Sequence, residues 1–339
     1  MRWRWVGVAL VFAFGGLFLV ANRSQLPSVW NAAREANLLF LGAAALVALL
    51  YLVNYGAMYR AAFRAVGLEL PLGAALRSAS AAHFLNMTIV NSGGAAGLAV
   101  FLREAAARQQ GRGLVVSAYL LVAVLGHLVF AVVLGAALAI AASDGQVSRL
   151  ELIATAVFSL YTVSQIALVV AAARSRNAVR WMHERPAALK RGLRRLFRQR
   201  DDAGTEPSNT AADELYDSFQ MILRRPGRMA LPAFHGLLVE AAGILTLWLC
   251  LRAFGVDAGI EEPLVAYAMG VLFSIVGFLP AGVGFAEAGL GLALASFGYG
   301  GTEIGLTVVT YRLFEVWVPF AVGALALHAS LRRPSAVEA

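Results

Sequence analysis

The chain has 339 residues, of which 60% are hydrophobic and only 14% are charged, whereas soluble domains carry about 25% charged residues. This deficit, together with several apolar runs of about 20 residues, excludes an ordinary soluble domain and predicts an all-α, polytopic integral membrane protein. We expect a single transmembrane domain over residues 1–339. The net charge of +8 lies mostly in loops, so it indicates membrane topology rather than a nucleic-acid partner.

The first predicted span covers residues 5–22 and follows Arg2 and Arg4. Two basic residues before an apolar run also fit a cleaved signal peptide. The run is long for the apolar core of such a peptide, and no clean A-x-A cleavage site follows it. We therefore favour an uncleaved first helix.

Five further spans are predicted, each long enough to cross a ~30 Å hydrocarbon core at about 1.5 Å per residue. They cover residues 38–59, 114–142, 150–173, 231–252 and 302–330. The total is then about six spanning helices. Two apolar segments, 72–102 and 263–299, fit a simple span less well.

Lysine and arginine in the loops set the predicted orientation. The basic segments, expected inside, are both termini, residues 60–64, 103–112 and 174–230. The acidic segment 255–262 has no basic residue and is expected outside. Segment 72–102 then begins and ends inside, and segment 263–299 begins and ends outside. Each is predicted to be a hairpin that turns back within the membrane, either re-entrant or as a pair of tilted helices.

Each predicted hairpin contains a glycine-rich break. The first break contains Asn91, Ser92, Gly93 and Gly94, with Gly97 beyond it, and the second contains Pro280, Gly282 and Gly284. The two halves of the chain have the same order of elements and opposite sense in the membrane. The sequence therefore predicts an inverted-topology repeat with broken helices, which is typical of secondary transporters. A chance arrangement of loop charges is the alternative.

The predicted cytoplasmic loop, residues 174–230, holds two helices. Residues 187–200 place leucines on one helical stripe and basic residues on the other face. This pattern suits a helix on anionic headgroups, with an ordinary positive-inside loop as an equal alternative. An acidic linker and a second helix over residues 211–225 follow, and the loop is too small for a soluble catalytic domain.

Signatures of catalysis and of metal binding are absent from the sequence. The five histidines are scattered and form no HExxH or paired-ligand spacing. There is no phosphate-binding loop, and GVGFAEAG is no dinucleotide fingerprint because no strand precedes it. We therefore expect no catalytic residues, no metal, no cofactor, no drive by ATP and no enzyme activity.

Ionisable residues at membrane depth are the candidate site residues, because burying one at a helix centre costs about 2.5–3.5 kcal/mol on insertion scales. Glu287 follows the second break, where free amides and a helix N-terminus meet an anion. Arg312 and Glu315 share a face of the last helix, and either is a candidate partner for Glu287. The role of these residues is substrate contact or gating, with a structural ion pair as an equal alternative.

Two further candidates lie near the first hairpin. Arg103, at its inner boundary, is a candidate contact for a lipid phosphate. Asn91 lies in the break and either contacts a ligand or satisfies broken backbone. Elsewhere, Glu240 and His127 are isolated in mid-helix, and each is more often a satisfied contact of a helix bundle than part of a proton relay.

Three stretches of the chain resemble the lysylphosphatidylglycerol synthase transmembrane-region family of flippase-like membrane proteins. They are LPAGVGFAEAGL, with Pro280, Gly282, Gly284 and Glu287; the glycine turn of Gly93, Gly94 and Gly97 that leads to Arg103; and YRLFEVWVP, with Tyr311, Arg312 and Pro319. The resemblance covers nearly the whole chain. The first turn departs from the family pattern, with NSGG where a proline is common.

The resemblance implies a multi-pass protein of a bacterial or archaeal cytoplasmic membrane. In the best-understood members this region moves aminoacylated phosphatidylglycerol between leaflets, beside a fused cytosolic aminoacyltransferase domain. That domain is missing from this sequence, so we do not expect the chain to synthesise the lipid. Other members associate with glycosyltransferases or with hopanoid gene sets.

Together, these observations lead to the hypothesis of a lipid flippase that is not driven by ATP and has both termini in the cytoplasm. It would carry a phosphate-bearing amphiphile, either an aminoacyl-phospholipid or a polyprenyl-linked lipid, along a polar path between the hairpins. Its partners would be membrane lipids and anionic headgroups. One alternative is a non-transporting partner of a lipid- or glycan-synthesis enzyme. Another is a membrane enzyme for a lipid-linked substrate, using Asp257, Glu261 and Glu262.

Overall fold

The computed structural model describes residues 34, 36–88, 94–143, 149–175, 209–276 and 280–331. Within these ranges the chain is largely helical and contains no strand, which confirms the predicted all-α fold. Several predictions lie outside the described residues. These are the first span at 5–22, the basic helix at 187–200, Asn91 and Gly93.

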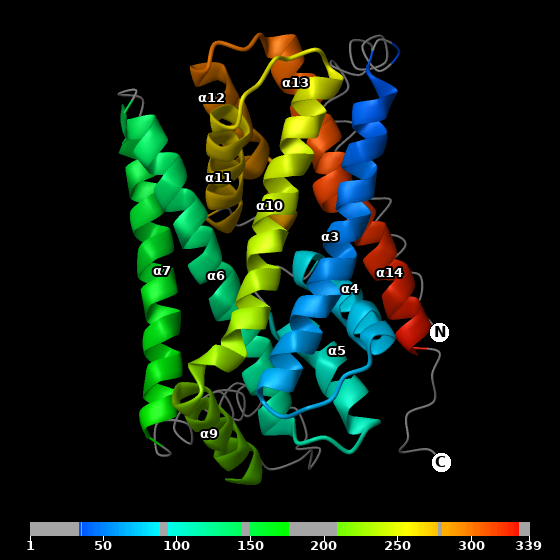
Figure 1. Cartoon of the computed structure of the whole chain (residues 1–339), viewed down its shortest axis with the longest axis vertical. Helices are drawn as coiled ribbons and strands as arrows, with labels where there is room; N and C mark the ends of the chain where they lie inside the picture. The colour runs from blue at the N-terminus through cyan, green and yellow to red at the C-terminus, as the bar shows by residue number, and fades with distance from the viewer. Residues whose placement is uncertain are drawn as a thin grey trace, which may run out of the picture.

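The helices follow one another along the chain, and Figure 1 shows their arrangement. They are α3 (Leu38–Ala65), α4 (Leu72–Thr88), α5 (Ala95–Ala106), α6 (Arg112–Ser143), α7 (Arg149–Arg174), α9 (Asn209–Arg224), α10 (Ala230–Ala253), α11 (Glu261–Val276), α12 (Phe285–Ser296), α13 (Gly301–Arg312) and α14 (Val318–Leu331). Two short 3-10 turns, η1 (Pro226–Met229) and η2 (Pro280–Gly282), precede α10 and α12. The π-helical turn η3 (Leu313–Trp317) joins α13 to α14.

Five stretches of the described chain are long and apolar enough to cross a membrane. They are Leu38–Ala65, Arg112–Ser143, Leu152–Ala171, Pro226–Ala253 and Gly301–Ser330. These stretches confirm the polytopic membrane fold, and each corresponds to one of the five predicted spans between residues 38 and 330, although the stretch Leu152–Ala171 is slightly shorter than the predicted 150–173. The number of spans in the whole chain stays a prediction.

Helix α3 is longer than the span predicted at 38–59. It ends at Ala65, so Arg60 and Arg64 lie in its last turns rather than in a following loop. The chain has no helix breaker before Gly67, which takes a φ of +86° and ends the helix. A helix of 28 residues is about 42 Å long, so this arginine-bearing end reaches past a ~30 Å hydrocarbon core toward the headgroups.

Both predicted hairpins are pairs of short helices. The arms α4 and α5 have 17 and 12 residues, and the arms α11 and α12 have 16 and 12. At about 1.5 Å per residue the arms are roughly 18 to 26 Å long, so none crosses a ~30 Å core upright. This length favours re-entrant hairpins over full spans.

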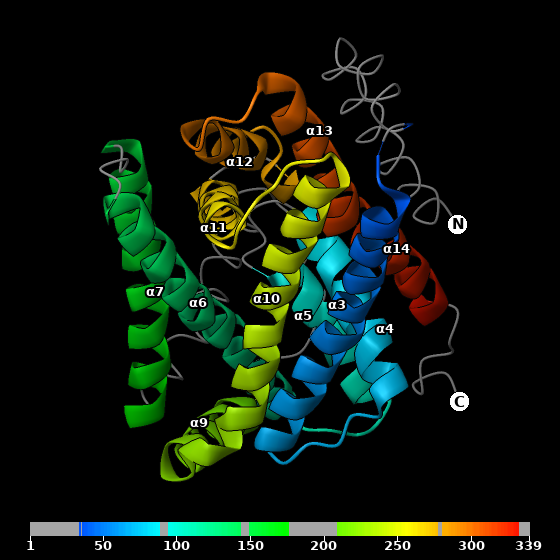
Figure 2. The same ribbon diagram turned by 45° about the horizontal axis from the view of Figure 1, so that its top comes forward.

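The hairpins lie at opposite ends of the molecule. In Figure 1, α4 and α5 occupy the lower half of the longest axis, whereas α11 and α12 occupy the upper half. The same separation is visible after the turn in Figure 2. Helix α4 contacts the turn η2 of the other hairpin, so the hairpins meet near the middle. An inverted repeat requires this arrangement, and the repeat itself stays a prediction.

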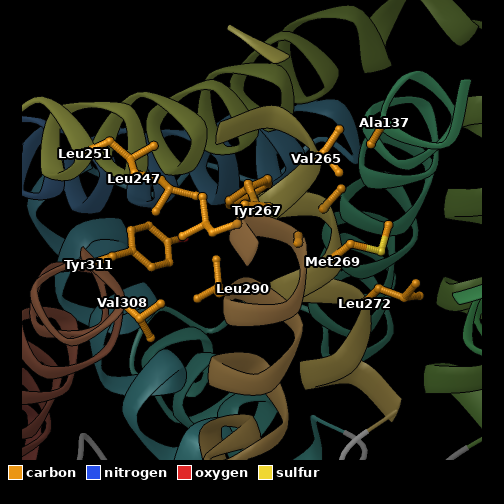
Figure 3. Close-up of a cluster of buried hydrophobic side chains, with 14 of the residues drawn as sticks. Ala137, Leu247, Leu251, Val265, Tyr267, Met269, Leu272, Leu290, Val308 and Tyr311 are labelled. Carbon is orange, nitrogen blue, oxygen red and sulfur yellow. The ribbon is translucent and has the colours of Figure 1, made fainter. Parts of the chain in front are cut away.

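Two apolar clusters hold the hairpins in the bundle. One joins α3, α4, α5, α6 and α9, and it includes Phe63, Phe101 and Phe219. The other joins α3, α6, α7, α10, α11, α12 and α13, and Figure 3 shows Tyr267 and Leu290 among its members. In lipid, helix association depends on such close packing, because burial of apolar surface gains little there. Each hairpin is therefore positioned by a packed cluster of its own.

The outer faces of the long helices carry large apolar side chains. Leu46 and Leu50 of α3 are more than half exposed, as are Leu160 and Val163 of α7. Rows of exposed apolar residues would promote aggregation in water, whereas lipid tails cover them. The surface agrees with a multi-pass membrane protein.

Candidate functional site

The second hairpin breaks in a turn with left-handed backbone. Ala281, Gly282 and Gly284 have φ values of +52°, +64° and +84°. A Cβ atom on Gly282 would lie 2.7 Å from the Cα of Ser274, so no side chain fits between this turn and α11. The left-handed conformation costs roughly 1–2 kcal/mol for a residue with a Cβ such as Ala281. The turn therefore needs contacts from its surroundings.

Arg312 supplies these contacts from the end of α13. Its side chain is only 3% exposed. Its Nη2 donates to the carbonyl oxygen of Ala281 at 2.7 Å, its Nε donates to Oε1 of Glu287 at 2.8 Å, and its Nη1 donates to Oε2 of Glu315 at 2.9 Å. Of the two candidate partners for Glu287, the structure selects Arg312. A single guanidinium thus joins the turn, the start of α12 and η3.

Glu287 also caps its own helix. Its Oε2 accepts a hydrogen bond from the backbone N–H of Gly284 at 2.6 Å, which satisfies one of the amides left free at the start of α12. A carboxylate near a helix N-terminus is further stabilised by the helix dipole. The break before α12 therefore explains why a carboxylate, Glu287, occurs in this apolar segment: it accepts a hydrogen bond from an amide that the break leaves free.

The charges in this cluster do not leave Arg312 free for a phosphate. Its guanidinium faces two carboxylates, Glu287 and Glu315, so the three ionised groups together carry a net charge of −1. As arranged, Arg312 positions the turn. Glu315 is the most open of the three, with a side chain that is 31% exposed.

The break of the first hairpin is closed by neutral polar groups. Oδ1 of Asn86 accepts from the N–H of Gly97 at 2.9 Å, and its Nδ2 donates to Oη of Tyr119 at 2.8 Å. Oη of Tyr119 in turn donates to the carbonyl oxygen of Gly94 at 2.9 Å. Side chains from α4 and α6 thus satisfy the freed backbone, as broken helices at membrane depth require.

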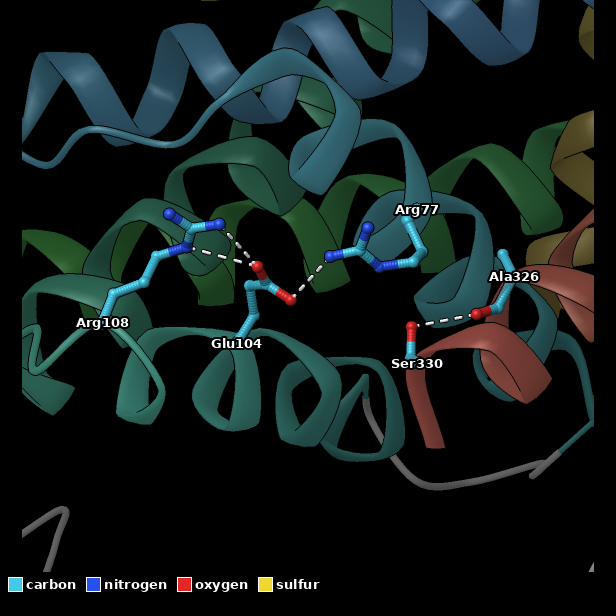
Figure 4. Close-up of polar contacts among 5 residues, drawn as sticks. All are labelled: Arg77, Glu104, Arg108, Ala326 and Ser330. Atoms are coloured by element: carbon cyan, nitrogen blue, oxygen red, sulfur yellow. Dashed lines mark hydrogen bonds and ion pairs between the residues drawn. The ribbon is translucent and has the colours of Figure 1, made fainter. Parts of the chain in front are cut away.

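The predicted phosphate contact Arg103 lies elsewhere. It is exposed in the last turn of α5, and α5 lies in the lower half of Figure 1, whereas α12 and α13 lie in the upper half. The structure does not bring Arg103 to Arg312. Beside it, Glu104 accepts from Arg77 at 3.0 Å and from Arg108 at 2.9 Å, which ties α4 to the end of α5, as Figure 4 shows.

Opposing effects act on the pKa of Glu104. Burial acts to raise this pKa, but hydrogen bonds and charges from Arg108 and Arg77 outweigh burial and hold it below its ordinary value of 4.5. The carboxylate is therefore ionised at neutral pH and ties the two arms of the hairpin together.

The acidic segment 255–262 does not form a metal centre in the part of the chain that the structure describes. Asp257 pairs with Arg252, and no group of three metal-binding side chains is found there. The alternative of an enzyme built on Asp257, Glu261 and Glu262 gains no support from this geometry.

A cavity of about 580 Å³ touches both hairpins. Asn86, Gly94 and Tyr119 line it at the first break, and Val271 and Ile275 line it from α11. Its volume lies within the range of about 300–1,000 Å³ that is usual for ligand pockets. The long helices add further polar side chains to the lining, among them His127, Gln165 and Glu240.

Glu240 is the residue that sequence reasoning undervalued. It is 8% exposed in the middle of α10, and Oη of Tyr267 donates to its Oε2 at 2.9 Å. No basic residue in the described ranges forms an ion pair with it. The only sign of this site in the sequence was a lone carboxyl group in an apolar span. Its partner Tyr267, on α11, could be identified only from the fold.

Comparison with known proteins identifies a family. The family model described as lysylphosphatidylglycerol synthase TM region matches residues 4–323, which include both hairpins and the Arg312 cluster. No curated protein matches the chain. The family match confirms the resemblance that the glycine turns indicate.

Proposed function

The chain belongs to the lysylphosphatidylglycerol synthase TM region family, and from this premise we propose that it moves a lipid between the leaflets of a membrane. Membership agrees with a lipid-related function of a multi-pass membrane protein. The proposed substrate is a phosphate-bearing amphiphile, such as an aminoacyl-phospholipid or a polyprenyl-linked lipid. The protein would work as a transporter rather than an enzyme, without ATP.

The cavity shared by the two hairpins is the observation that carries this proposal. It reaches from Gly94 at the first break to Ile275 on the second hairpin, and it has polar groups such as Gln165 in its wall. Transporters with broken helices bind their substrates where repeats from opposite sides meet. A headgroup in this cavity would have polar contacts while its acyl chains stay in lipid.

The proposed orientation places both termini and α9 in the cytoplasm of a bacterial or archaeal cell. A surface hollow of about 550 Å³, lined in part by Arg224, Arg225 and Arg228, lies where α9 meets η1. Arginines at the inner face attract anionic headgroups with about 1 kcal/mol each. This hollow supports anionic lipids as partners of the inner face.

Transport in liposomes tests the proposal. The purified protein is reconstituted with fluorescent phospholipids that differ in headgroup, and the loss of outer-leaflet fluorescence to a membrane-impermeant quencher is followed. We expect wild type to accelerate lipid movement for at least one phosphate-bearing headgroup. Gln165→Leu, which removes a polar group from the cavity, should slow this movement. The control is Ser164→Leu, which makes a similar change on the exposed face of α7.

Lipids that co-purify with the protein provide a second readout. Native nanodiscs of wild type should be enriched in one charged or polyprenyl lipid relative to the bulk membrane. The transporter proposal would be contradicted if the nanodiscs had the same lipid composition as the bulk membrane and if the protein accelerated the movement of no lipid headgroup in liposomes. This result would favour a membrane partner of a lipid- or glycan-synthesis enzyme, which would be sought by co-purification.

A further inference from the structure

Glu240 lies between two separate cavities. Glu240 lines the cavity of about 580 Å³ that touches both hairpins. Its hydrogen-bond partner Tyr267 lines a second cavity, of about 90 Å³, between α3, α10, α11, α13 and η3. The 2.9 Å hydrogen bond from Tyr267 to Glu240 therefore joins one cavity to the other.

The smaller cavity has polar groups in its wall. Besides Tyr267, the oxygen-bearing side chains in its lining are Tyr51, Thr246, Tyr311 and Glu315. The hydroxyl of Tyr311 belongs to a side chain that is only 1% exposed, and it has no hydrogen-bond partner among the described residues. A buried polar group without a partner usually marks an ordered water. A volume of about 90 Å³ is large enough to hold water.

Glu240 is buried without a basic partner among the described residues. Tyr267 from α11 is its hydrogen-bond partner, and the other titratable groups in its neighbourhood are Tyr51 from α3, Tyr311 from α13, Glu315 from η3 and His127 from α6. None of them forms an ion pair with Glu240, and the carboxylate of Glu315 is paired with Arg312. An isolated carboxylate is costly in an apolar interior, so a proton bound to Glu240 lowers the free energy.

The hydrogen bond depends on a specific gap in α10. A Cβ atom on Gly243 would lie 2.8 Å from Cζ and 2.9 Å from Oη of Tyr267. Because Gly243 has no side chain, the tyrosine ring lies against α10 and its hydroxyl reaches Glu240 one turn away. Figure 3 shows Tyr267 and Tyr311 within the apolar cluster that surrounds this contact.

We propose that Glu240 is a proton-exchange site that couples lipid movement to the proton gradient, an inference that rests on the proposed transport function. A hydronium ion in the smaller cavity gives a proton to the Tyr267 oxygen, and becomes neutral water, while Tyr267 gives its own proton to the Glu240 carboxylate. The resulting carboxylic acid releases that proton to water in the larger cavity. One proton enters, one leaves, and the tyrosine is regenerated.

The same contacts link the charge of this site to the second hairpin. Glu315, in the wall of the smaller cavity, accepts from Arg312, and Arg312 donates to the carbonyl oxygen of Ala281 in the turn. A change of charge at Glu240 therefore acts on groups that hold the break of this hairpin. Through the contacts of Glu315 with Arg312 and of Arg312 with Ala281, proton exchange at Glu240 would affect the conformation of the second hairpin.

Infrared spectroscopy tests the site without any transport. Infrared spectra of the purified protein in nanodiscs are recorded at neutral pH, and the carbonyl stretch of protonated carboxyl groups is measured. We expect this band in wild type and in Glu69→Gln, a matched change at an exposed loop glutamate. Glu240→Gln should lose it. A band of equal intensity in Glu240→Gln, with folding verified by gel filtration, overturns the proposal.

Transport with an imposed pH gradient tests the coupling. We expect the gradient to accelerate lipid movement several-fold in wild type, to have no effect in Glu240→Gln, and to have a smaller effect in Tyr267→Phe, which keeps the ring. A wild type that moves lipid at the same rate with and without the gradient overturns the coupling and leaves the transport function standing. If wild type moves no lipid at all, the transport function fails, and the infrared band alone decides whether Glu240 holds a proton.

Discussion

Arg312 donates a hydrogen bond to the carbonyl oxygen of Ala281 at 2.7 Å, across 31 positions of sequence. The acceptor is a residue with a φ of +52° in the turn of a broken helix. The donor is buried and also binds two carboxylates, Glu287 and Glu315. The conformation of the second turn is therefore fixed by a helix that follows it, rather than by the turn sequence alone.

We predict that Arg312→Ala strongly destabilises the protein. It leaves the Glu287 and Glu315 carboxylates and the Ala281 carbonyl without their donor, and breaking a buried ion pair costs about 3–5 kcal/mol. Thermal unfolding in detergent, followed by gel filtration, measures the loss. Arg252→Ala is the control, because Arg252 is more exposed and pairs with an almost fully exposed aspartate.

The lysine variant separates charge from geometry. Arg312→Lys retains the positive charge but has a single ammonium group in place of a planar fork, so it cannot reach three separate acceptors. We expect a stability between those of wild type and Arg312→Ala. Equal stability of Arg312→Lys and wild type would show that charge alone holds the turn.

The break of the first hairpin gives a second prediction. A Cβ atom on Gly97 would lie 2.6 Å from both Nδ2 of Asn86 and Oη of Tyr119. Gly97→Ala should therefore displace the hydrogen bonds that close this break, at about 1–3 kcal/mol for each polar group left unsatisfied. The same unfolding assay measures this cost. Gly73→Ala in α4, where a Cβ meets no atom within 4 Å, should leave stability unchanged, and equal effects of the two variants would contradict the assignment.

Glu104 gives a prediction about pH. Because its pKa in the folded protein lies below the ordinary value of 4.5, its contacts with Arg77 and Arg108 add stability above that value. This stability is lost as the pH falls through the lowered pKa, when the folded protein must take up the proton. Melting temperatures across the acidic range should thus fall less steeply for Glu104→Gln than for wild type. Parallel curves would contradict this role, and Glu69→Gln, at an exposed loop position, serves as the control.

The sequence predicted what depends on local pattern. Apolar runs and loop charges located the described spans and both hairpins, and the glycines at 282 and 284 located the second break. Contacts between distant segments could not be predicted in this way. Tyr267 meets Glu240 because α11 packs on α10 where Gly243 leaves room, and neither residue has a local signal for the other.

The same limit applies to the candidate site. The cluster of Glu287, Arg312 and Glu315 has two local signals. Arg312 and Glu315 are three residues apart and so share a helix face, and Glu287 follows the break of the second hairpin. Arg103 was grouped with them because its chemistry suits a phosphate, but α5 lies at the other end of the bundle. Residue chemistry alone does not determine which end of a membrane bundle a side chain occupies.

The close approach of Tyr267 to α10 gives the last prediction. Gly243→Ala should push the tyrosine ring away and break its hydrogen bond to Glu240, since a Cβ there would lie 2.8 Å from Cζ. Tyr267→Phe removes the same hydrogen bond directly, at about 1–3 kcal/mol for a buried group left unsatisfied. Because both variants lose one interaction, the double variant should cost less than the sum of the single variants.

Unfolding free energies of the four proteins in this cycle measure the coupling between Gly243 and Tyr267. Gly236→Ala on the same helix is the matched control, because a Cβ there meets only the side chains of Val129 and Met58, at 3.3 and 3.4 Å. Its cost should add to that of Tyr267→Phe. If the costs of Gly243→Ala and Tyr267→Phe are also additive, the glycine does not position the tyrosine, and the hydrogen bond to Glu240 must be held by the packing of α11 alone.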